Sequence, residues 1–224
     1  MTTLITPDQL QKIATRLTPE KALKISNLLC SICPLYGINT ADIFHEFIAN
    51  VLHESGEFTT LEENLNYSAK ALRSLFGKHR ISDSECELYG RTNTHPANKE
   101  MIANTIYGGQ WGKVNLGNTQ QGDGWIFRGS GAIQNTGRSN ITKFTTYYNA
   151  RFGTSFTPEQ MAELLRLDMA ISIHSACWFF SIAKNLIQLA IDDKMKEITQ
   201  RINGGQIGMN ERLHYLNLAE KYII

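Results

Sequence analysis

Acidic side chains crowd one short stretch of this chain, residues 54–63, which holds Glu54, Glu57, Glu62 and Glu63. Two carboxylates can hydrolyse a glycosidic bond when one donates a proton to the leaving oxygen and the other activates a water on the opposite face of the sugar. The two groups then need unlike surroundings. Glu54, at the end of an apolar run, is expected to be partly desolvated and to keep its proton, whereas Glu63 on the following polar segment would stay ionised. A plain solvated turn is the alternative for the cluster.

The element that positions the first acid is an expected helix over residues 40–56. Its apolar residues recur at the spacing of one helix face and are Ile43, Phe44, Phe47, Ile48, Val51 and Leu52. Gly56 ends this pattern, so His53 and Glu54 fall in the last turn. A histidine at that position is predicted to cap carbonyls or orient a neighbour rather than to transfer protons.

Helix signals continue along most of the chain. Thr-Pro-acid triplets starting at Thr6 and Thr18 predict two short opening helices, the second ending near Gly37. Further helices are expected over residues 68–76, 98–107, 158–183, 185–201 and 210–224, with 168–183 as a buried central helix. Glycines interrupt the pattern over residues 108–140, which predicts loops and a short hairpin. The expected fold is mainly α, in a single domain over 1–224 on which short N-terminal helices (1–38) pack.

The near-neutral charge narrows the classes of partner. The chain has 224 residues, with 22 Lys and Arg against 21 Asp and Glu and a formal charge of +1. No broad field would therefore attract nucleic acid or an anionic membrane. The basic run Lys78-His79-Arg80 is expected to be a solvated helix end. No long apolar run predicts membrane insertion, and the N-terminus lacks the pattern of a secretory signal.

The cysteines are few and scattered, which does not predict a disulfide framework. Cys30 and Cys33 form a C-x-x-C pair in apolar surroundings, and no second Cys or His pair follows at zinc-finger spacing. Buried thiols are expected here rather than a metal or redox site. Synthesis in a reducing compartment fits this pattern.

Motifs in four segments, spread over about residues 39–222, resemble those of family 19 glycoside hydrolases. His53–Gly56 is similar to H-E-[ST]-G, and Glu63–Ala69, with the sequence E-N-L-N-Y-S-A, resembles the motif of the bacterial and phage-lysin branch. Asp123–Gln134 resembles G-x-x-[YF]-R-G-R-G-x-I-Q, and Ile202–Gly205 resembles I-N-G-G. The order and number of these motifs identify the chain as a member of the family.

The resemblance implies a lysozyme-like, two-lobed helical fold with a central substrate cleft and hydrolysis of β-1,4 bonds beside N-acetylated sugars with inversion. Glu54 corresponds to the general acid and Glu63 to the general base of the lysin branch. Thr136 lies where the family has a hydroxyl that helps hold the attacking water. Chitinase members place the base in a different local context, so Glu57 and Glu62 remain rivals of Glu63. The chemistry requires no metal or cofactor.

Other positions of the motifs correspond to substrate-binding and supporting groups, namely Asn66, Tyr67, Arg128, Gln134 and Asn203 for the substrate and His53 and Arg212 for support. Amide side chains can donate to and accept from hydroxyl and acetamido groups. Tyrosine offers an apolar ring face and a polar rim to a sugar. The resemblance implies that Arg212 pairs with the catalytic carboxylates.

Some aromatic and loop positions leave alternatives open. Tyr67 could line the cleft or belong to the core, and Trp111 and Trp125 could stack on sugar or anchor loops, whereas Trp178 is expected to pack inside. The chain departs from the family pattern at Ser130, where a second arginine is usual, and at Asn135, where an apolar residue is usual. These departures concern substrate preference more than activity.

The leading hypothesis is an endolysin-like muramidase that cleaves bacterial peptidoglycan. A chitinase acting on N-acetylglucosamine polymer and a catalytically silent cell-wall-binding protein are the alternatives. We expect a monomer made in the cytoplasm without a signal peptide and acting on the cell wall after release or export. Its expected partners are a holin-type pore former or an immunity protein.

Overall fold

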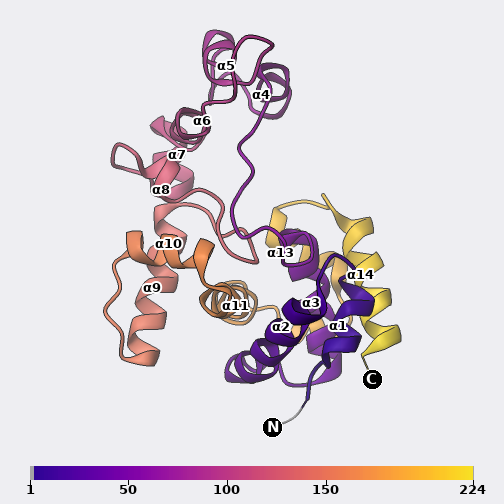
Figure 1. The fold of residues 1–224 in the computed structure, drawn as a ribbon. Helices are drawn as coiled ribbons and strands as arrows, with labels where there is room; N and C mark the ends of the chain where they lie inside the picture. Colours follow the sequence, from indigo (N-terminus) through magenta and orange to yellow (C-terminus); the bar gives the residue numbers. More distant parts are fainter. Residues whose placement is uncertain (1–2, 224) are drawn as a thin grey trace. The chain divides into compact units, whose positions relative to one another are not determined.

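The computed structural model describes residues 3–223, and within them the chain forms helices and isolated β-bridges but no β-strand (Figure 1). The chain divides into two compact units. Unit 1 comprises the chain up to Leu61, the segment Gly131–Gln134 and the chain from Leu165 onward, and unit 2 comprises Glu62–Ser130 and Asn135–Leu164. The predicted mainly α class is confirmed. The prediction of a single domain stays a prediction.

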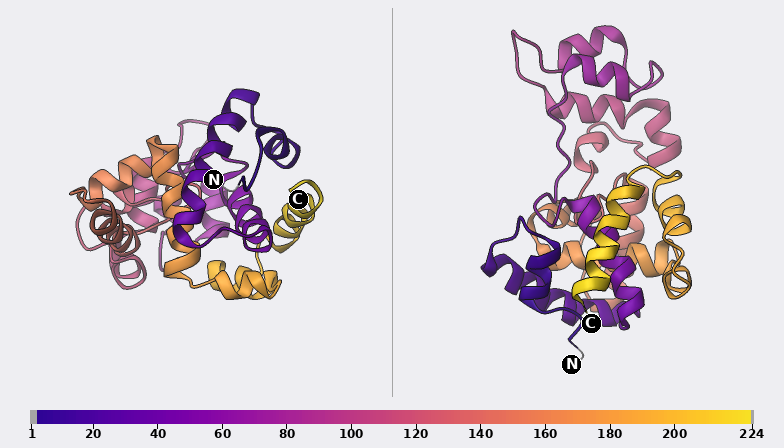
Figure 2. Two further views of the ribbon diagram at one scale, coloured as in Figure 1. Left: turned by 90° about the horizontal axis from the view of Figure 1, so that it is seen from below. Right: turned by 90° about the vertical axis from the view of Figure 1, so that its right-hand side faces the viewer.

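Unit 1 is built around one buried helix, α3 (Ala41–Ser55). The other helical segments of this unit are α1 (Pro7–Ile13), α2 (Pro19–Ile32), the 3-10 turn η1 (Cys33–Tyr36), α11 (Met169–Trp178), the π-helical turn η2 (Phe179–Ala183), α12 (Ile187–Ile191), α13 (Met195–Asn203) and α14 (Met209–Tyr222). Helices α14 and α12 pack against α3, and α11 packs against α2 (Figures 1 and 2). Because α3 is covered on several sides, even polar residues along it are buried.

The predicted start and stop signals of unit 1 are present. Thr6 and Thr18 accept hydrogen bonds from backbone N–H groups in the first turns of α1 and α2. Gly37 follows η1 in the left-handed conformation, and Gly56 ends α3 in the same way. Phe47 on α3 meets Phe180 edge to face, with ring centroids 5.5 Å apart. These apolar contacts fix the axis of α3, which carries Glu54 in its last turn.

Unit 2 contains α4 (Ala69–Leu75), α5 (Asp83–Tyr89), α6 (Lys99–Ile106), α7 (Gly109–Leu116), α8 (Asp123–Ile126) and α9 (Arg138–Phe152), and α10 (Pro158–Leu167) begins in it. Its buried cluster consists of Leu65, Leu72, Ile81, Cys86, Ile102, Ala103 and Ile106. Tyr67, Phe76, Tyr107 and Trp125 pack against this cluster. The aromatic residues therefore surround the core that supports the Glu63 segment.

Several predicted boundaries need correction. The helix expected over 158–183 is divided at Asp168, whose side chain caps α11, and the helix expected over 185–201 is divided between α12 and α13. Asp193 takes a left-handed conformation in that second break, with φ 52°. Helices α5, α7 and α8 were not predicted. The glycine-rich segment does carry a tight antiparallel turn in which Ser130 and Asn135 exchange backbone hydrogen bonds.

No helix among residues 3–223 is long and apolar enough to cross a membrane.

Candidate active site

In unit 1, Glu54 lies in the last turn of α3, where sequence analysis placed it. Its side chain is 19% exposed, and Arg212 Nη2 of α14 donates to its Oε1. The Arg212 side chain is fully buried, and its Nη1 donates to Asn50 Oδ1 at 2.5 Å. Asn50 is one helical turn before Glu54 on α3, so the two residues share a face. The arginine thus fixes one oxygen of Glu54 and leaves the other without a hydrogen-bond donor among residues 3–223.

The start of α14 is held against the end of α3 by a close approach. Gly208 precedes α14 with φ 77°, and a Cβ atom there would lie 2.3 Å from His53 Nε2. His53 Nδ1 lies 2.8 Å from Glu211 Oε2. Only glycine fits both the conformation and the space. His53 therefore positions the helix that carries Arg212. Its supporting role in a reaction stays a prediction.

Glu57 belongs to a strained turn directly after α3. Glu57 and Phe58 follow Gly56 with φ 64° and 59°, a region that non-glycine residues seldom adopt. The Glu57 carboxylate accepts from the backbone N–H of Arg16 at 2.8 Å and from the Tyr215 hydroxyl at 3.1 Å. Burial beside this carboxylate raises the pKa of Tyr215 to about 12. Glu57 is 6% exposed, so its carboxylate serves the packing of unit 1.

In unit 2, Glu63 is held by two hydrogen-bond donors. The Tyr107 hydroxyl donates to its Oε1 at 2.6 Å, and the backbone N–H of Gly129 donates to its Oε2 at 3.2 Å. The backbone N–H of Glu63 donates in turn to the Gly129 carbonyl at 2.9 Å. Burial, followed by the charge and hydrogen bond of Glu63, raises the pKa of Tyr107, so the phenol stays a donor. Glu63 is half-buried with its orientation fixed.

Glu62 has a different role from its neighbour. Its Oε1 accepts from Arg128 Nε at 2.8 Å and from Arg128 Nη2 at 2.6 Å. The Arg128 guanidinium also lies over the Trp125 ring, 3.6 Å from the centroid. Arg128 is 7% exposed, so most of its side chain is covered by groups of unit 2. One face of Trp125 is thus occupied by the arginine, which favours the loop-anchoring interpretation of this tryptophan.

The segment after Arg128 carries both departures from the family pattern. Ser130 is buried, and its hydroxyl donates to the Arg128 carbonyl at 2.8 Å. Asn135 is 2% exposed, and neither of its amide atoms has a hydrogen-bond partner among residues 3–223. Gln134 has φ 51°, and its side chain donates to the Gly131 carbonyl at 3.0 Å. Thr136 is half-buried in unit 2, directly before α9.

The remaining predicted substrate residues are divided between the units. Asn66 is exposed and Tyr67 is half-buried in unit 2, where the Tyr67 ring meets Phe76 edge to face at 5.6 Å between centroids. Burial and the charge of Glu63 raise the pKa of Tyr67. Asn203 is exposed at the end of α13 in unit 1, and its amide donates to the Ile207 carbonyl at 3.0 Å. Gln134 also belongs to unit 1. Trp178 is buried, as expected.

The prediction that Arg80 belongs to a solvated helix end is wrong. Lys78 is exposed and pairs with Asp83, but Arg80 is half-buried, with its guanidinium over the Trp111 ring at 3.8 Å from the centroid. The aromatic residues of unit 2 cover the Arg80 side chain. The run of three basic residues had predicted a solvent-exposed position. Trp111, like Trp125, therefore has one face against an arginine.

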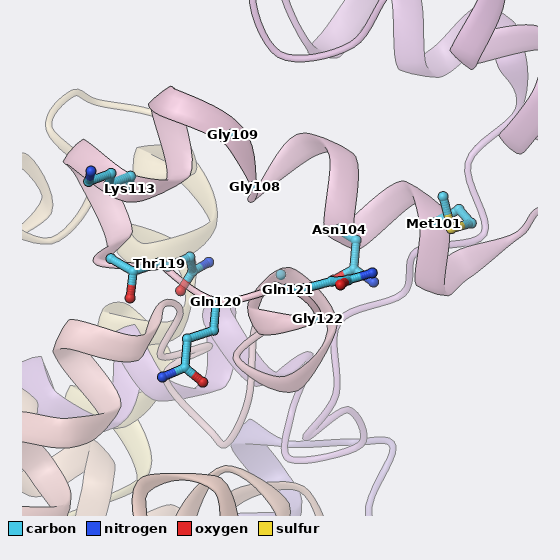
Figure 3. Close-up of a pocket in the computed structure, with 11 residues that line it drawn as sticks. Met101, Asn104, Gly108, Gly109, Lys113, Thr119, Gln120, Gln121 and Gly122 are labelled. Atoms are coloured by element: carbon cyan, nitrogen blue, oxygen red, sulfur yellow. The ribbon is translucent and has the colours of Figure 1, made fainter.

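A pocket of about 390 Å³, lined mostly by glycines and residues with polar side chains, lies between α6, α7 and the loop before α8 in unit 2. Figure 3 shows Asn104 and Lys113 on the two helices, with Thr119, Gln120 and Gln121 on the loop. Amide and hydroxyl groups of this kind can exchange hydrogen bonds with sugar hydroxyls. Sequence analysis did not single out this pocket, because its lining is drawn from segments without a shared motif.

The thiols are free, and Cys33 and Cys177 are buried with their sulfur atoms 3.7 Å apart. Burial raises the pKa of Cys33. Cys30 is half-buried and donates to the Ile5 carbonyl. Within residues 3–223, His, Cys, Asp and Glu side chains do not form a group of three that could hold a metal ion.

Solved structures define the class of protein to which this fold belongs. Chitinase C from Streptomyces griseus HUT6037 is similar with a TM-score of 0.58 and 14% identity over 100% of this chain and 78% of that one. A class IV chitinase of family GH19 from Zea mays has a TM-score of 0.55 and 14% identity, over 99% of this chain and 94% of that one. The predicted lysozyme-like helical class is confirmed by these similarities.

Sequence similarity identifies the family. No family model matches the chain. A Haemophilus influenzae protein described as "Glycosyl hydrolase family 19 domain-containing protein" is 36% identical over 166 residues, which are 74% of this chain and 72% of that protein. The chain belongs to glycosyl hydrolase family 19. Membership implies glycoside hydrolase activity, and the fold suggests a polysaccharide substrate.

Proposed function

We propose that the chain is a peptidoglycan hydrolase of the endolysin type, which cleaves β-1,4 glycosidic bonds with inversion. The observation that supports this proposal most strongly is that the four glutamates of residues 54–63 differ in their contacts and in their exposure to solvent. Glu57 is buried in structural contacts and Glu62 holds Arg128. Glu54 and Glu63 are each oriented by donors while remaining partly accessible. These two are therefore the acid and the base of the proposed reaction.

The proposed reaction is a single displacement. Glu54 donates a proton to the glycosidic oxygen as the bond to the anomeric carbon breaks, and water attacks that carbon from the opposite face. Glu63 accepts the proton released by the water. The products are a free alcohol on the leaving sugar and a hemiacetal of inverted configuration, so protons and bonds balance. Thr136 helps hold the attacking water in this proposal.

The supporting residues have distinct tasks in this scheme. Arg212 orients Glu54 through Oε1, and Tyr107 and the Gly129 N–H orient Glu63. A carboxylate oxygen has lone pairs beyond the one that accepts each of these bonds, so Glu63 can still accept from water. Asn66, Tyr67, Gln134 and Asn203 are proposed to contact the sugar. Arg128, being covered by Glu62 and Trp125, shapes the wall of the base region.

The choice of peptidoglycan rests on the segment Glu63–Ala69, whose sequence has the pattern of the lysin branch. Chitin is the second candidate substrate, because the similar solved structures are described as chitinases. Mass spectrometry of the products from purified peptidoglycan and from chitin separates the two. We expect muropeptides with a new reducing end from peptidoglycan. Products from chitin alone would overturn the proposed substrate.

A protein that binds the cell wall without cleaving it would need no acid and base. Retention of both Glu54 and Glu63 therefore favours catalysis. Co-sedimentation with peptidoglycan without any released product would establish the binding alternative.

Delivery is proposed from the location of the substrate. Peptidoglycan lies outside the cytoplasm, so a chain made inside requires a pore-forming partner or an export system, and in the second case an immunity protein. Expression in bacteria with and without a co-expressed pore former tests this, with lysis expected only when both are present.

A further inference from the structure

Arg80 is held in one orientation by the aromatic surface of unit 2. Its guanidinium carbon lies 3.8 Å from the centroid of the Trp111 ring, 4.7 Å from that of Phe76 and 5.6 Å from that of Tyr107. Its Nε donates to the Ile106 carbonyl at 2.9 Å. Stacking and one backbone bond leave the two terminal nitrogens, Nη1 and Nη2, as the remaining donors of the side chain.

These terminal nitrogens have no hydrogen-bond acceptor among residues 3–223. The two other covered arginines of unit 2 differ in this respect. Arg128 binds Glu62, and Arg138 binds Asp123 and Glu159. Arg80 is half-buried without a bound carboxylate, and burial lowers its pKa, although the charge stays in place because guanidinium groups remain protonated. A fixed, partly desolvated cation with free donors is suited to an anionic ligand.

The position of Arg80 relates it to the proposed base. The Tyr107 ring lies beside the guanidinium, and the hydroxyl of the same tyrosine donates to Glu63. The Glu63 charge also acts on Arg80. A sugar ring placed for attack at Glu63 would therefore carry its ring substituents into the vicinity of Arg80.

We propose that Arg80 binds a carboxylate carried by the side chain of an N-acetylmuramic acid residue of the substrate, an inference that rests on the proposed peptidoglycan hydrolase function. Peptidoglycan offers such a group as the lactyl carboxylate of a bare glycan or as a carboxylate of the stem peptide. Chitin has neither. Arg80 is thus the residue that favours muramyl substrates over N-acetylglucosamine polymers.

The kinetic test compares wild type with Arg80→Gln on three substrates: intact peptidoglycan fragments, the same glycan freed of peptides by an amidase, and neutral N-acetylglucosamine oligomers. Arg73→Gln is the matched control, since Arg73 is an exposed arginine of the same unit that already pairs with Glu87. We expect Arg80→Gln to lower kcat/KM about tenfold to a hundredfold on the acidic substrates and less than about twofold on the neutral one. The lactyl carboxyl is an amide in intact fragments and a free carboxylate only on the peptide-free glycan. A loss restricted to intact fragments therefore assigns the ligand to the stem peptide, a loss restricted to the peptide-free glycan assigns it to the lactyl carboxylate, and a loss on both shows that Arg80 accepts either carboxylate. Equal losses on acidic and neutral substrates, or no loss, would overturn the proposal.

A binding measurement separates this inference from the proposed function. Tryptophan fluorescence follows titration with N-acetylmuramic acid, muramyl dipeptide and neutral diacetylchitobiose, because Trp111 stacks on Arg80. We expect salt-sensitive binding of at least one acidic probe that Arg80→Gln weakens about tenfold or more, with diacetylchitobiose unaffected. This result without any hydrolysis by wild type would overturn the proposed function and support the role of Arg80. Equal affinity of wild type and Arg80→Gln for every probe would reject that role even if peptidoglycan is cleaved.

Discussion

At the scale of single residues, the contact between Tyr107 and Glu63 offers a direct test of the base. Tyr107→Phe removes only the hydroxyl that donates to Glu63 at 2.6 Å. Without this donor the carboxylate can rotate away from the attacking water, so activity should fall. We expect kcat to fall about tenfold to a hundredfold, less than the ~10²–10⁴-fold that a positioned acid or base contributes, because Tyr107 orients the base and does not itself transfer the proton. Steady-state kinetics of hydrolysis measures this effect.

Tyr89→Phe is the control for this variant. Tyr89 packs against the same core cluster, but its hydroxyl makes no hydrogen bond with residues 3–223. Its kcat should equal that of wild type. A Tyr107→Phe variant that also keeps the kcat of wild type would remove the hydroxyl from the catalytic scheme.

Arg212 is the second residue-scale test. It is fully buried between Asn50 and Glu54, and removing one partner of a buried ion pair typically costs about 3–5 kcal/mol. Because Glu54 is still partly exposed, we expect Arg212→Met to lower the free energy of unfolding by about 2–4 kcal/mol and to reduce activity. Urea unfolding measures the first effect. The exposed Arg201→Met should change stability by less than about 0.5 kcal/mol, and an Arg212→Met variant as stable as that control would contradict the account.

Sequence analysis predicted the position of a residue within its helix better than it predicted which distant residues that side chain contacts. Glu54 was placed in the last turn of its helix because the apolar spacing and Gly56 are local signals. The link from Tyr107 to Glu63 joins positions 44 residues apart, and nothing in the spacing of either residue indicates it. Arg80 was misplaced for a related reason. The aromatic residues that cover it come from distant segments that only the folded core brings together.

At the scale of elements, the start of α14 depends on Gly208. Gly208→Ala forces a side chain into a left-handed conformation, which costs about 1–2 kcal/mol, and directs its Cβ against His53. The helix start must shift to relieve the clash, and Arg212 moves with it. We expect a loss of stability above about 2 kcal/mol together with a lower kcat, measured by thermal unfolding and hydrolysis.

Gly153→Ala is matched to this change, since Gly153 has φ 67° but open space where a Cβ would lie. Gly153→Ala should lower the free energy of unfolding only by the strain of a left-handed alanine, about 1–2 kcal/mol, and should leave kcat unchanged. Equal effects of the two substitutions on stability and kcat would show that contact with His53 does not position α14.

The errors at this scale concern where helices stop. No glycine or proline separates α10 from α11, and apolar residues occur in both helices, so the break at Asp168 was missed. Helix α5 was detectable, because Ser82 and Glu85 have the spacing of a capping box and form one. Helix α7 contains glycine at its start and within it, which local propensity disfavours. Its packing on α9 offsets that preference.

At the scale of the whole molecule, Glu46 links stability to pH. It is 1% exposed on α3, neither carboxylate oxygen has a hydrogen-bond partner among residues 3–223, and burial near Asp193 and Glu220 raises its pKa from 4.5 to about 8. Between these values the folded chain holds a proton that the unfolded chain has lost. The contribution of Glu46 to the free energy of unfolding is therefore full below pH 4.5 and is lost as pH rises toward 8. The free energy of unfolding falls by at most about 1.4 kcal/mol per pH unit from this group.

Urea unfolding at several values from about pH 5 to pH 8 measures this dependence. Glu46→Gln keeps the shape of the side chain without its titration, so its stability should vary less over the same range. Parallel curves for wild type and Glu46→Gln would contradict the assignment of the effect to Glu46.

Composition and motifs were sufficient for the fold class and the family, because helix periodicity and the four motif segments are properties of short stretches. The division into two units was less accessible. Unit 1 is assembled from three separate segments and includes only Gly131–Gln134 from the middle of the chain. Such a partition depends on packing between distant segments, and no local composition change accompanies it.

The central claim is that Glu54 and Glu63 act as acid and base on a cell-wall glycan. The most direct measurement is reducing-end release from purified peptidoglycan by wild type, Glu54→Gln and Glu63→Gln side by side, with Glu62→Gln as the neighbouring control. We expect wild type to cleave and both folded variants, Glu54→Gln and Glu63→Gln, to lose activity by roughly three orders of magnitude or more, while Glu62→Gln keeps a measurable rate. Wild-type rates in a folded Glu54→Gln or Glu63→Gln variant would contradict the claim.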